Sequence, residues 1–114
     1  MGKSIFYHNP RCSKSRQALA LLEAQNIEFE IKLYLQDGVE ADEVVALSKK
    51  LSMHPSEFIR KGEPVYKDLG ADEFSIEEWA AIIEEHPILL ERPILMVGDK
   101  AIIGRPPEAV LTII

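Results

Sequence analysis

The hydrophobic periodicity of this chain changes twice within its first third, and this change limits the folds that are open to it. Residues 3–8 contain a short apolar run that is typical of a strand. Residues 13–26 carry apolar side chains at helical spacing, and Asn26 is expected to end that helix. Residues 29–33 alternate apolar and charged side chains, as a second strand does. The pattern predicts a β-α-β unit, whose right-handed crossover makes the two strands parallel.

The middle of the chain, over about residues 40–86, is predicted to be helical. Residues 40–52 place apolar side chains on one side of a helix. Pro55 can begin a short helix, because proline is tolerated in a first turn. The run Ser-Ile-Glu-Glu at 75–78 is a capping-box pattern, and it predicts a helix over about 76–85.

The last third of the chain returns to strand patterns. Residues 93–97 form an apolar run, Gly-Asp at 98–99 predicts a hairpin turn, and residues 101–103 supply the partner strand. A final short helix is expected to begin at Pro106. The resulting order is β-α-β, helices, β-β-α. This is the layout of a thioredoxin-like α/β fold with a helical insertion.

The chain length suits one such domain. Its 114 residues are enough for one hydrophobic core, so we expect a single domain over residues 1–114 with the insertion at about 40–86. Proline lacks a backbone N–H and is confined to strand starts, edges and bulges, which fits Pro93 at the start of its strand. In a thioredoxin-like fold a cis-proline that faces the active-site thiol occupies this place.

Composition excludes several classes of function. The formal net charge is −6 and no basic stripe is visible, so nucleic-acid binding is not expected. No apolar stretch approaches the length of a membrane span, and the N-terminus leaves no room for a signal peptide. One cysteine cannot form an internal disulfide, so we expect a cytoplasmic protein. The three histidines and one cysteine have no metal-ligand spacing, so no metal site is expected.

Cys12 is the only cysteine, and it lies in the polar segment 8–16, between the first predicted strand and the first predicted helix. A helix N-terminus carries a partial positive charge and unpaired N–H donors. Together with Arg11, Lys14 and Arg16, this environment favours the reactive thiolate over the thiol. The alternative is a buried cysteine that acts as a small hydrophobe. The polar, basic surroundings argue against that alternative.

Three of the five arginines stand at the ends of predicted elements, beside glycine or proline. They are Arg60, Arg92 and Arg105. The arginine fork of donors matches oxyanions in a bidentate way, and neighbouring glycine and proline residues fix the backbone from which a side chain is aimed. The three arginines are therefore candidates for an anion site. Alternatively, each pairs with one of the 19 acidic residues on the surface.

The segment 8–16, His-Asn-Pro-Arg-Cys-Ser-Lys-Ser-Arg, resembles the active-site loop of the glutaredoxin-dependent arsenate reductase (ArsC-like) family. Residues 59–69, 91–94 and 103–107 resemble the later motifs of that family, in the same order along the chain. The resemblance is closest to the arsenate-reductase-like, YfgD-type branch. Ser13 and Lys14 stand where well-studied members have glycine and threonine, and Lys14 adds a positive charge.

The resemblance implies a thioredoxin-like fold and a specific reaction, the reduction of arsenate to arsenite. Because one cysteine cannot resolve its own arsenic adduct, an external thiol is required, and the resemblance implies glutathione as co-substrate and glutaredoxin as partner, with no bound cofactor. The implied roles are the following: Cys12 is the nucleophile, Arg60, Arg92 and Arg105 bind the anion, His8, Ser15 and Arg16 tune the thiolate, and Pro93 is the cis-proline.

Two other functions stay open at this point. A glutathione-dependent thiol-disulfide reductase would need Cys12 but not the arginines as a set. A non-enzymatic, Spx-like regulatory protein would bind RNA polymerase and use a cysteine pair as a redox switch. Ser15 occupies the position of the second cysteine, so only a redox-independent binding role is compatible with this chain. The sequence leaves the oligomeric state open.

Overall fold

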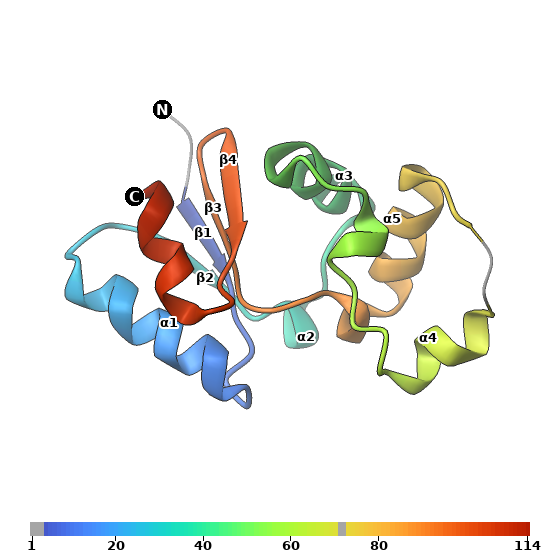
Figure 1. Ribbon diagram of the computed structural model, residues 1–114, viewed down its shortest axis with the longest axis horizontal. Helices are drawn as coiled ribbons and strands as arrows, with labels where there is room; N and C mark the ends of the chain where they lie inside the picture. The colour runs from blue at the N-terminus through green and yellow to red at the C-terminus, as the bar shows by residue number, and fades with distance from the viewer. Residues whose placement is uncertain (1–3, 71–72) are drawn as a thin grey trace. The chain divides into compact units, whose positions relative to one another are not determined.

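The computed structural model describes residues 4–70 and 73–114, and its ribbon is drawn in Figure 1. The chain divides into two compact units: the residues up to Asp37 together with Arg92–Ile114, and the residues Gly38–Glu91. The first unit contains β1 (Ser4–Tyr7), α1 (Ser13–Ala24), β2 (Glu30–Lys32), α2 (Tyr34–Asp37), β3 (Ile94–Val97), β4 (Lys100–Ile103) and the 3-10 helix η3 (Pro107–Ile113). The second unit contains α3 (Ala41–Leu51), the 3-10 helix η1 (Pro55–Glu57), α4 (Pro64–Leu69), α5 (Ile76–Glu85) and the 3-10 helix η2 (Pro87–Leu89).

The four strands form one sheet in the order β2-β1-β3-β4. β1 is parallel to β2, and β3 forms an antiparallel hairpin with β4, as the sequence predicts. β1 also pairs with β3, in the antiparallel direction. Tyr7, the last residue of β1, pairs with Lys32 on one side and Ile94 on the other. Ile94 in turn pairs with Ile103 at the end of β4. The ends of β1, β2 and β4 and the start of β3 therefore meet at one end of the sheet.

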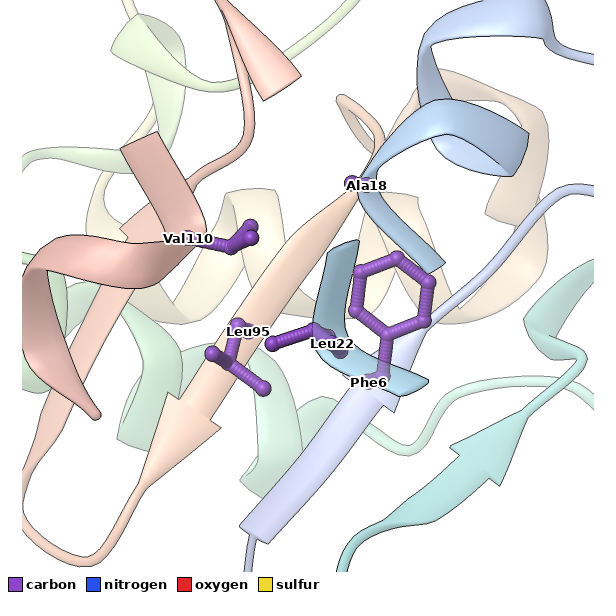
Figure 2. Close-up of a cluster of buried hydrophobic side chains, with 5 residues drawn as sticks. All are labelled: Phe6, Ala18, Leu22, Leu95 and Val110. Carbon is purple, nitrogen blue, oxygen red and sulfur yellow. The ribbon is translucent and has the colours of Figure 1, made fainter. Parts of the chain in front are cut away.

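The hydrophobic core of the sheet unit lies on the face covered by α1 and η3. Phe6 of β1 and Leu95 of β3 meet Ala18 and Leu22 of α1 and Val110 of η3, and all five side chains are fully buried (Figure 2). Burial of a large apolar side chain contributes about 1.5–3 kcal/mol, so this cluster fixes α1 on the sheet. Ser15 lies one turn before Ala18 on the same buried side of α1.

The structure differs from the sequence prediction around β2. The predicted strand 29–33 shrinks to the three residues of β2, and Ile31 is 47% exposed, because β2 is an edge strand with one neighbour. The helix α2 follows at once, where the sequence predicts only a turn at Asp37 and Gly38. A helix of four residues is too short to show a helical period in the sequence.

The second unit is helical, and its main packing is between α3 and α5. Val44 and Leu47 of α3 and Ile83 of α5 are fully buried. The predicted capping box is confirmed: the Ser75 hydroxyl accepts a hydrogen bond from the Glu78 N–H, and the Glu78 carboxylate accepts one from the Ser75 N–H. α4 lies within the stretch predicted to be helical, although the sequence analysis named no separate helix at its residues. The assignment of one domain to residues 1–114, with an insertion at about 40–86, stays a prediction. Across residues 4–70 and 73–114, no helix has the length and apolar character that crossing a bilayer requires.

Gly104, which follows β4, permits a close contact that any side chain would block. A Cβ atom built at this position lies 2.7 Å from Cγ of Pro93 and 3.0 Å from a methyl carbon of Val110. We expect Gly104→Ala to lower the free energy of unfolding by about 1–3 kcal/mol, because it overpacks a rigid contact. Gly62→Ala is the matched control, since a Cβ there has no neighbour within 4 Å. Urea denaturation measures both variants, and equal stabilities would contradict the expectation.

Candidate active site

Cys12 is the N-cap residue of α1, where the sequence analysis placed it. Its backbone is extended, with φ −93° and ψ 123°, and its carbonyl accepts the first helical hydrogen bond, from the N–H of Arg16. The Cys12 N–H donates to the carbonyl of Asn9, which closes a tight turn before the helix. The cysteine is half-buried. The thiol therefore sits at the N-terminus of a twelve-residue helix and remains accessible.

The buried Ser15 side chain is hydrogen-bonded to two residues of the loop before Cys12. Its side chain is 0% exposed, and its hydroxyl accepts a hydrogen bond of 3.1 Å from the Asn9 N–H. The same hydroxyl is joined to Nδ1 of His8 by a hydrogen bond of 2.7 Å. His8 is 5% exposed and stacks on Phe6 with ring centroids 5.4 Å apart. These bonds couple the turn before Cys12 to the hydrophobic core.

Basic side chains surround the turn. Arg16 Nη1 donates to the Pro10 carbonyl at 2.9 Å, so Arg16 holds the loop as well as adding charge. The first turn of α1, Ser13–Arg16, contains Lys14 and Arg16 and no carboxylate. The first turn of α3 and that of α5 each contain two acidic residues. No acidic side chain of the first turn offsets the positive end of the α1 dipole, so this end can attract an anionic ligand.

Arg105 is brought to the thiol from 93 residues away. Its Nη2 lies 3.7 Å from Cys12 Sγ, a hydrogen-bonding distance for sulfur, and its Nε donates to the carbonyl of Arg92 at 2.9 Å. The Arg105 guanidinium is therefore fixed through Nε, while its Nη2 faces the sulfur. This geometry places a charged hydrogen-bond donor beside the sulfur.

Arg92 and Pro93 adjoin Arg105 through the backbone. Arg92 is half-buried, and its carbonyl accepts the hydrogen bond from Arg105 Nε. The Arg92–Pro93 peptide bond is cis, as is the Arg105–Pro106 bond. The Gly104 N–H donates to the Pro93 carbonyl at 2.8 Å. The segments 92–93 and 104–105 are thus joined directly, at the end of the sheet that carries Cys12.

Arg60 belongs to the helical unit, and its guanidinium is bonded to carboxylates there. Its Nε lies 3.1 Å from Glu63 Oε2, and its Nη1 lies 3.9 Å from Glu91 Oε1. Backbone hydrogen bonds from Arg60 to Leu89 and from Glu91 to Phe58 hold the two segments together. Carboxylate pairing, the alternative considered for each arginine, thus applies to Arg60.

The structure adds Asn9 to the candidate residues. Besides donating to Ser15, Asn9 accepts the Cys12 N–H on its carbonyl and the Arg11 N–H on its side-chain oxygen, at 3.0 Å each. Asparagine side chains commonly accept backbone hydrogen bonds in turns. The pair Asn9-Pro10 in the sequence was therefore the one sign that Asn9 could shape this loop. In residues 4–70 and 73–114, no group of three or more histidine, cysteine, aspartate or glutamate side chains could hold a metal ion.

The buried His8 predicts a pH-dependent stability. Burial lowers the pKa of His8 below its usual value of 6.5, and Arg16 lowers it further, while Glu23 opposes the shift. The unfolded chain therefore binds a proton at His8 more readily than the folded chain, so stability rises with pH across this window. The contribution is present above about pH 6.5 and is lost as the pH falls from there towards the pKa of the folded state.

His8→Gln tests this expectation. Urea denaturation at a series of pH values between about 5 and 7.5 should show a smaller loss of stability on acidification in the variant than in the parent protein. Gln keeps polar atoms available to Ser15 but carries no titratable proton. An identical pH dependence in the two proteins would contradict the assignment to His8.

The fold and the loop together define a class: a thioredoxin-like protein with one thiol at a helix N-terminus, contacted by an arginine. Within that class the chain belongs to the ArsC family, whose model matches residues 7–113. It is 46% identical to an arsenate reductase of Haemophilus influenzae, over 96% of this chain and 97% of that protein. It is 45% identical to the Escherichia coli protein YfgD, named as uncharacterized, over 95% and 93% of the two chains.

A solved structure agrees with the fold. The arsenate reductase from Vibrio cholerae matches with a TM-score of 0.91 and 40% identity, over 98% of each chain. The family membership and the thioredoxin-like α/β fold that the sequence predicts are thereby confirmed.

Proposed function

We propose that this protein is an oxidoreductase that reduces arsenate to arsenite, with Cys12 as the nucleophile. One observation carries the proposal: in a chain of the ArsC family, Arg105 Nη2 lies 3.7 Å from Cys12 Sγ at the N-terminus of α1. A thiolate is a nucleophile, and at this place it would have anion-binding donors beside it. Relatives named as arsenate reductases support the choice of oxyanion.

The oxyanion would bind between the first-turn N–H groups of α1 and the guanidinium groups of Arg105 and Arg92. A helix N-terminus without acidic side chains attracts an anion, and each charge-assisted hydrogen bond contributes about 1.5–3 kcal/mol. Arg60 is proposed as a third ligand on the family resemblance. To bind the anion, Arg60 would exchange its bonds to Glu63 and Glu91 for bonds to arsenate.

The proposed chemistry transfers two electrons to arsenic. The Cys12 thiolate attacks arsenic, and one arsenate oxygen leaves as water after protonation. A glutathione thiolate then attacks Sγ, the electron pair of the S–As bond stays with arsenic, and arsenite departs. Cys12 is left in a mixed disulfide with glutathione. Glutaredoxin then takes over the glutathionyl group and restores the Cys12 thiol.

An external thiol is required in this scheme because the chain holds no second cysteine. We propose glutathione as co-substrate, glutaredoxin as partner and the cytoplasm as the place of action, since thiol pools are kept reduced there. His8, Ser15 and Arg16 hold the loop that presents Sγ. Pro93, whose peptide bond to Arg92 is cis, is proposed as the proline that faces the thiol. No resident cofactor or metal enters the proposal.

A coupled assay tests the function. The purified protein is incubated with arsenate, glutathione, glutaredoxin, glutathione reductase and NADPH, and both NADPH oxidation and arsenite are measured. Arsenate-dependent NADPH oxidation that stops when glutaredoxin is omitted would support the proposal. Activity only with thioredoxin and its reductase would overturn the proposed donor, and no arsenite with either system would overturn the function.

A further inference from the structure

A cavity of about 340 Å³ lies beside the Cys12 loop, within the sheet unit. Residues 8–11 of the loop form one part of its lining, and Leu33, Leu35 and Gln36, which follow β2, form the other. Arg11 and Gln36 are exposed, and the Leu35 side chain is 42% exposed. The lining thus combines apolar side chains with the guanidinium of Arg11 and the carboxamides of Asn9 and Gln36. His8 holds the loop, but the proposed chemistry assigns no step to Arg11 or to the residues that follow β2.

The position of this cavity follows from the order of the strands. β1 lies between β2 and β3, and the loop that carries Cys12 leaves the end of β1. Arg105, anchored on the Arg92 carbonyl, reaches this loop from the end of β4, whereas the other part of the cavity lining comes from the segment that follows β2. The His8 N–H donates to the Lys32 carbonyl at 3.0 Å, which joins the loop to that segment. The reactive loop therefore meets Arg105 from β4 and the cavity lining from the segment after β2.

We propose that this cavity binds the reducing thiol, a small peptide thiol with carboxylate groups such as glutathione, and that Arg11 binds one of its carboxylates. The proposal rests on the proposed function, which requires an external thiol at Cys12. A volume of about 340 Å³ is at the lower end for small-molecule sites, in the range for a tripeptide. Among the described residues that line it, Arg11 is the only cation, and Leu33 and Leu35 offer apolar contact.

Charge favours this occupant. The chain carries a net charge of −6, so an anionic ligand needs a local positive field. Arg11, Lys14 and Arg16 supply that field in and next to the loop, and the exposed guanidinium of Arg11 borders the cavity itself. Of the described residues that line the cavity, none is Cys12 or Arg105, so a thiol bound here would leave an oxyanion on Arg105 in place and would have to reach Sγ past Arg11, the neighbour of Cys12. The two substrates would then contact different residues beside one loop.

Binding of S-methylglutathione, whose sulfur is blocked, tests the proposal without any turnover. Isothermal titration calorimetry and amide chemical shifts of the whole protein are measured for the parent, Arg11→Gln, Leu35→Glu and Lys49→Gln. Arg11→Gln should weaken binding about tenfold, the size of one charge-assisted hydrogen bond. Leu35→Glu should weaken binding through charge repulsion. Lys49→Gln removes one exposed positive charge of α3, in the other unit, and should leave the affinity unchanged.

The outcomes separate this proposal from the proposed function. Shifts confined to residues 8–11 and 33–36, with weaker binding in Arg11→Gln, would support the cavity even if arsenate were not reduced. Absent binding, shifts elsewhere or an unchanged Arg11→Gln affinity would overturn the cavity even in an active arsenate reductase. In the coupled assay, the proposal expects Arg11→Gln to raise KM for glutathione and to leave KM for arsenate unchanged.

Discussion

Cys12→Ser is expected to reduce arsenate-dependent NADPH oxidation and arsenite formation to the level without enzyme. The serine hydroxyl is not ionised at neutral pH and cannot form the S–As bond, and the sequence contains no other thiol to replace it. No partial activity is expected, because in the proposed scheme both the attack on arsenic and the release of arsenite take place at Sγ. Arsenite measured directly, beside NADPH, excludes side reactions of glutathione.

The control for Cys12→Ser is the state of the fold. Serine differs from cysteine by one atom at a half-buried position, so circular dichroism and the melting temperature should be close to those of the parent. A variant that is folded and inactive would assign the loss to chemistry. A folded variant that still makes arsenite would eliminate the proposed nucleophile.

Arg105→Ala is expected to lower kcat/KM for arsenate about tenfold to a hundredfold, the size of one lost charge-assisted hydrogen bond in the transition state. Arg105→Lys should recover part of this loss. Lysine restores the charge, but it cannot bond the Arg92 carbonyl and face Sγ at once, as the guanidinium does through Nε and Nη2. Lys100→Ala, at an exposed position in β4, is the charge-matched control and should be unaffected.

A second substrate distinguishes the alternatives for Arg105. Reduction of 2-hydroxyethyl disulfide with glutathione needs Cys12 but no oxyanion ligand. If Arg105→Ala lowers arsenate reduction much more than disulfide reduction, Arg105 acts on the oxyanion. If both activities fall equally, Arg105 acts through the thiolate alone, and if neither falls, its proposed role is wrong.

The elements that carry Cys12 could be predicted from the sequence because each had a complete local signal. The apolar run of β1, the helical period of α1 and the Gly-Asp turn after β3 are all encoded by neighbouring residues. Gly98 adopts φ 60° at that turn, as the turn chemistry requires. The short elements α2 and α4 had no such signal, since four to six residues do not establish a period.

The site itself could be predicted only in part. The basic segment around Cys12 marked the thiol, but its 3.7 Å contact with Arg105 depends on the packing of segments 93 residues apart. The carboxylate partners of Arg60 and the bond between Ser15 and Asn9 depend on tertiary structure in the same way. The tight approach of Gly104 to Pro93 could not be foreseen, because it depends on the distance between two backbones.

The buried hydroxyl of Ser15 also limits how this protein could evolve. A cysteine at this position would give the chain its own pair of thiols, three residues apart, so that the second thiol could release the product from Cys12 and an external reductant would be needed only to reopen the disulfide. Sulfur, however, is a weak hydrogen-bond donor and acceptor, so the bonds to His8 and the Asn9 N–H would be weakened in a fully buried place. The turn before Cys12 is therefore held by a hydroxyl group that a second thiol could replace only by weakening the loop that presents the first.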